Sequence, residues 1–85
     1  MKTKPTPAQY REAYEEIGHM ICVHGEILGR AEMLGVLANL VGRLIAMQEF
    51  TTMTSEHALA IVHKNIQEGN YQMCTMLGPD EGSIN

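Results

Sequence analysis

One helical pattern of unusual length constrains the fold of this 85-residue chain more than any other feature. Eleven positions follow one another at strict spacings of four and three residues, and we call them the long seam. They are Tyr10, Tyr14, Ile17, Ile21, His24, Leu28, Ala31, Gly35, Ala38, Gly42 and Ile45. A 3.5-residue repeat held over about five heptads is typical of helices that pack lengthwise against a partner helix.

The long seam changes in side-chain size along its length. Its first half is bulky, whereas between Leu28 and Ile45 it holds only Ala and Gly. Large residues meet small ones when two copies lie antiparallel with paired residue numbers that sum to about 56, and this pairing is self-complementary. Tyr14 then faces Gly42, and Ile21 faces Gly35. Because such an interface leaves no voids, the pattern predicts an antiparallel coiled coil between two copies of the chain.

A first helix is expected over residues 7–49, because Thr6 is a favoured N-cap and Pro7 a favoured first helical residue. Gly25 and Gly29 bracket the only plausible turn, and the segment between them offers no Ser, Thr, Asp, Asn or Pro as a cap. Two interpretations follow: one long helix, straight or kinked, or a hairpin that turns at residues 25–29. The hairpin would make nearly the same seam pairs within one chain, but the unbroken register favours the single helix.

A second helix is expected over residues 55–77, with Thr54 or Ser55 as its N-cap and Gly78–Pro79 as its stop signal. Met53 is placed to pack on its first turn. Its apolar residues lie within about 100° of one another on the helical wheel. They are Ala58, Leu59, Val62, Ile66, Gly69, Met73, Met76 and Leu77.

These patterns predict an all-α fold, an antiparallel helical bundle completed by homodimerisation. We expect one domain over residues 1–85, with flexible termini at 1–6 and 79–85. A domain this small buries only about 60–65% of its unfolded surface, so association with a second copy would relieve its marginal stability. Residues 31–47 are apolar nearly all round and need cover on every side. They are too few for a membrane span and include Asn39 and Arg43, which argues against a membrane partner.

The charge and cysteine content exclude several classes of protein. The net charge is −4 and the six Lys and Arg are scattered, so we expect no nucleic-acid partner. Two cysteines are too few for a disulfide scaffold, and residues 1–7 contain no apolar secretion segment. The sequence therefore predicts a reduced, cytoplasmic protein.

Glu16 and His19 have the spacing with which one helix offers a carboxylate and an imidazole to a metal ion. Cys22 lies one turn further on and would complete the set. Glu16 and His19 lie outside the seam face, however, whereas metal sites of helical bundles project inward. A solvated acidic face around Glu12, Glu15 and Glu16 is the interpretation we favour. A metal site at an oligomer contact is the alternative.

His24 occupies a core position of the long seam. A polar seam residue commonly fixes the register of a coiled coil. In the dimer it would approach Ala31 and Glu32 of the second copy, so a pH-sensitive interface is a second hypothesis for it.

No catalytic constellation is visible. His63 and Cys74 are about 16 Å apart along a helix, too far for a nucleophile and its base. The methionines fill a core or line an adaptable groove for a partner helix. We therefore expect no cofactor and no enzymatic activity, and predict a homodimeric interaction or regulatory accessory module that binds another protein. The alternative is a metal-binding helical protein that uses Glu16 and His19, with Cys22.

Overall fold

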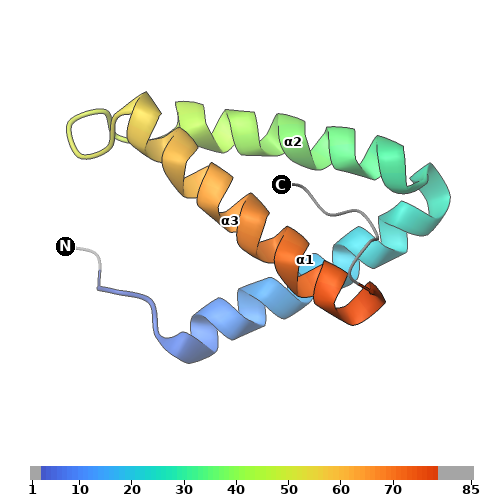
Figure 1. Cartoon of the computed structure of the whole chain (residues 1–85). Helices are drawn as coiled ribbons and strands as arrows, with labels where there is room; N and C mark the ends of the chain where they lie inside the picture. Colours follow the sequence, from blue (N-terminus) through green and yellow to red (C-terminus); the bar gives the residue numbers. More distant parts are fainter. Residues whose placement is uncertain (1–2, 79–85) are drawn as a thin grey trace. The chain divides into compact units, whose positions relative to one another are not determined.

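The structure, a computed structural model, describes residues 3–78 and is helical throughout its regular secondary structure. Its three helices are α1 (Pro7–Leu28), α2 (Arg30–Ala46) and α3 (Ser55–Leu77) (Figure 1). The expected all-α class is confirmed, whereas the homodimer remains a prediction. The expected flexible terminus at 79–85 lies outside the described residues.

A single residue, Gly29, separates α1 from α2, so the expected continuous helix over residues 7–49 is wrong. Gly29 has a φ of 91°, which favours glycine, and the chain changes direction there (Figure 1). Its N–H donates to the Gly25 carbonyl at 2.8 Å, and its carbonyl accepts from the Met33 N–H at 3.0 Å. One glycine thus ends α1 and begins α2, which is why no Ser, Thr, Asp or Asn is needed there.

The N-termini of α1 and α3 lie where the sequence predicts them. The Thr6 hydroxyl accepts from the Gln9 N–H at 3.2 Å, and the Gln9 side chain accepts from the Thr6 N–H at 2.8 Å, forming a capping box. The Thr54 hydroxyl accepts from the His57 N–H at 3.1 Å. At its other end α3 stops before Gly78, which has a φ of 127°.

The C-terminus of α2 comes earlier than expected, at Ala46 instead of residue 49. The Leu44 carbonyl near this end accepts from the Met47 N–H at 3.2 Å and from the Gln48 side-chain amide at 3.0 Å. A turn follows, closed by the Met53 N–H, which donates to the Glu49 carbonyl at 2.8 Å. The connection to α3 is therefore longer than the predicted link over residues 51–53.

The chain divides into two units, Met1–Val41 and Gly42–Asn85. In the first unit, half-buried residues recur every three or four positions on α1 and α2, and we call them the covered stripe. They are Gly18, Ile21, Gly25, Met33, Leu37 and Val41. A Cβ at Gly25 would lie 3.9 Å from Met33 Cγ, so the two helices meet beside the turn.

In the second unit, burial is concentrated at the start of α3. Ala58 is 4% exposed and is the one buried residue of the described chain. Met53 precedes the N-cap and is half-buried. Met53 and Ala58 occupy the two positions of a hydrophobic staple, as the sequence predicts for Met53.

Candidate interaction surface

The long seam is exposed on both helices that carry it. On α1, Tyr10 is 65%, Tyr14 77% and Ile17 57% exposed, and His24 is exposed as well. On α2, the small residues of the seam are also exposed: Ala31, Gly35, Ala38 and Gly42. Ile21 and Ile45 are the half-buried members. The seam is therefore accessible along nearly its whole length.

The two glycines of the long seam, Gly35 and Gly42, have open space above them in the described chain. A Cβ added at Gly35 or Gly42 would meet no atom within 4 Å outside the backbone of its own helix. The chain does turn within residues 25–29, as the hairpin interpretation requires, but Ile21 does not pack on Gly35. The Ile21–Gly35 pair that the hairpin alternative requires is thus not formed, and α1 meets α2 beside the turn through Gly25 and Met33.

Large apolar side chains are exposed on each of the three helices of the described chain. Ile27 is 78% exposed on α1, Leu34 is 71% exposed on α2, and Met76 is 79% exposed on α3.

α3 carries a second heptad pattern, which we call the α3 seam. Its members alternate at spacings of three and four residues: Leu59, Val62, Ile66, Gly69, Met73 and Met76. Sequence reasoning found the apolar face of this helix but missed its strict spacing, which was the signal available. Val62 is half-buried, the other five members are exposed, and a Cβ at Gly69 would meet nothing within 4 Å.

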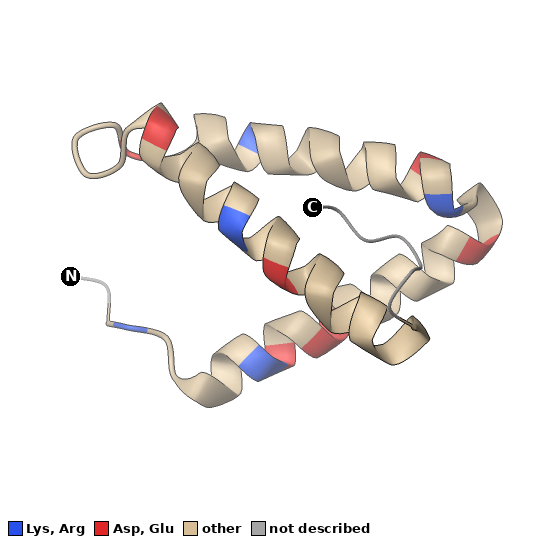
Figure 2. Ribbon diagram, viewed as in Figure 1, with Lys and Arg blue, Asp and Glu red and all other residues tan. Residues whose placement is uncertain are grey.

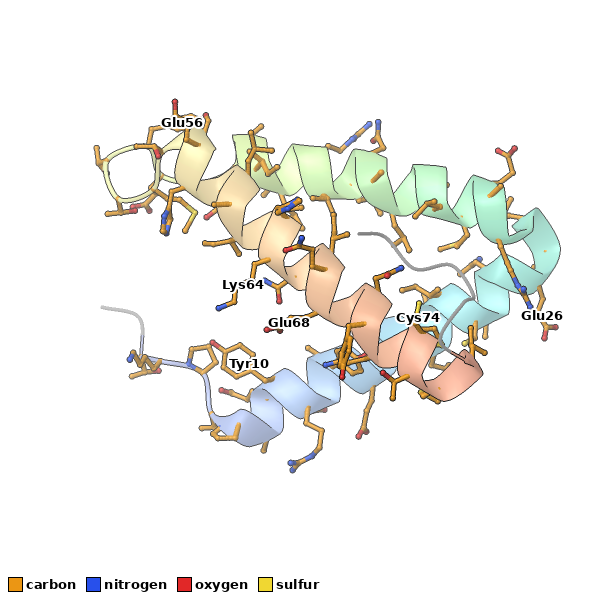
Figure 3. All side chains as sticks on the ribbon, viewed as in Figure 1. Tyr10, Glu26, Glu56, Lys64, Glu68 and Cys74 are labelled. Carbon is orange, nitrogen blue, oxygen red and sulfur yellow. The ribbon has the colours of Figure 1, made fainter. Side chains whose placement is uncertain are left out.

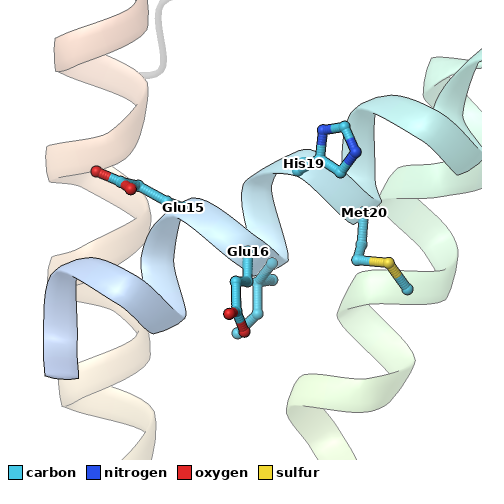
Figure 4. Close-up of a pocket in the computed structure, with 5 residues that line it drawn as sticks. Glu15, Glu16, His19 and Met20 are labelled. Carbon is cyan, nitrogen blue, oxygen red and sulfur yellow. The ribbon is translucent and has the colours of Figure 1, made fainter.

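The candidate metal ligands Glu16, His19 and Cys22 are all exposed on α1. Figure 4 shows the Glu16 carboxylate and the His19 ring directed away from each other, beside an open depression lined by Glu15–Ile17, His19 and Met20. Within residues 3–78, no group of three or more His, Cys, Asp or Glu side chains is placed to hold a metal ion. One chain therefore does not assemble the proposed ligand set.

The other candidate residues are likewise dispersed. His63 is exposed on α3, whereas Cys74 is half-buried and its thiol lies 3.7 Å from the Asn70 side-chain oxygen. Neither Cys22 nor Cys74 forms a disulfide bond within the described residues. The structure brings none of these groups into a nucleophile and base arrangement.

The charged side chains leave both seams free of charge. Along α2 they are confined to Arg30, Glu32 and Arg43, with an uncharged stretch between the last two (Figure 2). On α3, Lys64 and Glu68 project from the same side of the helix (Figure 3). None of the described helices is both long enough and apolar enough to cross a membrane.

Comparison with known proteins gives no relative from which a function could be transferred. No protein-family model, no curated protein and no solved structure matches the chain.

Proposed function

We propose that this chain is a small, non-catalytic helical protein that acts as a protein–protein interaction or regulatory accessory module, and that it works as a homodimer through the long seam. The observation that carries the proposal is the exposure of most of the long seam on α1 and α2, while the covered stripe, which shares only Ile21 with it, is half-buried. The net charge of −4 supports a protein partner over nucleic acid or an anionic membrane. A cytoplasmic location would keep both thiols reduced.

The exposed glycines support a second copy as the first partner. Glycine in a helix interior costs about 0.5–1 kcal/mol relative to alanine, so its repeated use at exposed positions needs a compensating gain. Close approach of another backbone supplies that gain. The bulky residue that would fill the space is present on the same chain: Tyr14 for Gly42 and Ile21 for Gly35, in the antiparallel register.

Gly35→Leu and Gly42→Leu test the proposal by sedimentation equilibrium. Within one chain neither side chain meets a neighbouring atom at Cβ, and each substitution improves helix propensity. In the dimer each overpacks the seam at a cost of roughly 1–3 kcal/mol, a weakening of association of about 5- to 150-fold per site. The sign of the effect thus separates an isolated chain from an assembled one.

Gly35→Ala and Gly42→Ala are the matched controls, because they add helix propensity with one small methyl group. We expect them to retain far more association than the leucine variants. If both leucine variants keep the wild-type mass and gain stability, the seam has no partner and the proposal is wrong.

A further inference from the structure

We propose that Gly29 is a hinge at which the chain switches between the bent form of the structure and a second form, in which one continuous helix runs from Pro7 to Ala46. The groups that make the hinge all lie within the first unit, Met1–Val41. The inference goes beyond the proposed dimer, because it concerns a change of conformation within one chain. Only its consequence for association rests on the proposed function.

α1 and α2 are joined as one helix would be if it were opened at a single residue. The Gly29 N–H donates to the Gly25 carbonyl at 2.8 Å, and the Met33 N–H donates to the Gly29 carbonyl at 3.0 Å. A continuous α-helix makes the same two hydrogen bonds. Neither hydrogen-bonded ring contains the φ or ψ bond of Gly29. A rotation of Gly29 from a φ of 91° and ψ of 157° to helical values therefore leaves both bonds in place.

Three backbone hydrogen bonds separate the two forms. In the bent form, as the structure describes it, the N–H groups of residues 30–32 do not donate to the carbonyls of residues 26–28. All six residues are exposed, so these groups are open to water. A continuous helix pairs them with one another. Beside the turn, straightening breaks the contact between Gly25 and Met33, which is an ordinary van der Waals contact. The two forms thus differ by a few weak interactions of opposite sign.

The sequence pattern supports the second form. The long seam keeps its spacing through the break, since Leu28 and Ala31 are three residues apart. Two helices joined by a turn need not share a heptad phase, whereas a continuous helix must keep one phase to hold its seam on a single face. α1 and α3 each begin after a threonine cap, but α2 begins after Gly29, which has no side chain to cap it.

The hinge sets the shape of the long seam. In the continuous helix the seam is one unbroken face, and the antiparallel pairs whose residue numbers sum to about 56 continue through Leu28 at the centre. In the bent form the two halves of the seam lie on separate helices. The straight form is therefore the one that matches a second straight copy. A larger fraction of straight chains should tighten the dimer.

The distance between two spin labels on the full chain tests the hinge. Labels at Glu12→Cys and Leu40→Cys, with Cys22→Ser and Cys74→Ser, lie four heptads apart, away from the long seam and within the first unit. A continuous helix separates the two labelled Cα atoms by about 42 Å, whereas the bent form brings them closer together. Dilution with unlabelled chain of the same sequence restricts the measured distances to one chain.

Gly29→Ala should move the labels from the shorter distance to about 42 Å. Alanine is strained at the backbone angles of Gly29 and favours a helix, so we expect the ratio of straight to bent chains to rise about 30-fold or more. Gly18→Ala is the matched control. It adds the same methyl group within α1, where a Cβ meets nothing within 4 Å, and should leave the distance unchanged. Circular dichroism should show that Gly29→Ala keeps its helix content, because both forms contain α1 and α2.

An unchanged distance in Gly29→Ala overturns the hinge, as does a loss of its helix content or a wild type with the long distance alone. Sedimentation equilibrium of the same samples separates this failure from failure of the long-seam dimer. A longer distance in a Gly29→Ala chain that stays at the mass of one copy supports the hinge and refutes the dimer. A wild-type assembly that Gly35→Leu dissociates, with no change of distance in Gly29→Ala, overturns the hinge and leaves the dimer standing.

Discussion

α2 carries two uncharged stripes, and only one of them is covered within the chain. One holds the large residues Met33, Leu37 and Val41, which are half-buried. The other holds Ala31, Gly35, Ala38 and Gly42, which are small and exposed without being polar. A solvated face needs neither glycine nor alanine, and glycine weakens a helix. The residues of the first stripe pack within the chain. We propose that the residues of the second stripe pack against the backbone of another copy.

Leu37→Ala should break the covered stripe and has the largest expected effect on the fold. Because Leu37 is half-buried, we expect the free energy of unfolding to fall by about 2–3 kcal/mol, in the lower part of the range for buried leucines. Urea denaturation measures this. Leu34→Ala is the matched control, since Leu34 is 71% exposed and should cost far less. Equal losses of unfolding free energy at the two positions would contradict the assignment of a covered and an exposed face to α2.

Gly29→Ala should perturb the turn that brings the covered stripe together. The φ of 91° and ψ of 157° at Gly29 belong to a region that is essentially restricted to glycine. We expect a loss of about 1–2 kcal/mol, because an exposed turn relaxes part of the strain. Gly18→Ala is the control: its Cβ meets nothing within 4 Å, and helix propensity should make it stabilising. A Gly29→Ala chain as stable as Gly18→Ala would mean that the turn does not form.

Gly25→Ala has the smallest expected effect on the free energy of unfolding. The added Cβ would lie at ordinary contact distance from Met33, 3.9 Å from its Cγ. We therefore expect a gain of about 0.5–1 kcal/mol from helix propensity. Thermal denaturation checks the sign. A clear loss of stability would show that a second chain approaches α1 at Gly25, which would move the partner from the long seam to the covered stripe.

The sequence predicted the helices well where local chemistry decides them. Thr6, Pro7, Thr54 and Gly78 mark the helix ends correctly, because capping and positive φ depend on a few adjacent residues. The sequence favoured one continuous helix over a break at Gly29, because no cap residue lies between Gly25 and Gly29. A glycine whose N–H and carbonyl serve both helices removes the need for that cap.

The sequence predicted which residues form the long seam, but it did not predict which residues pack between α1 and α2. Spacing identifies the long seam, yet spacing alone did not show that α1 and α2 meet through Gly25 and Met33 rather than through Ile21 and Gly35. That choice depends on the geometry of the turn. The α3 seam could have been found from the same kind of spacing, and only the exposure of Leu59, Ile66 and Met73 shows that it is accessible.

The mass of the wild-type chain in solution, measured by sedimentation equilibrium beside Gly35→Leu, tests the central claim most directly. We expect the wild type to have a mass that is a multiple of the 9.4 kDa chain mass, and Gly35→Leu to reduce it. A wild type that remains at 9.4 kDa over the same concentrations, with Gly35→Leu indistinguishable from it or more stable, would contradict the claim that a second copy covers the long seam.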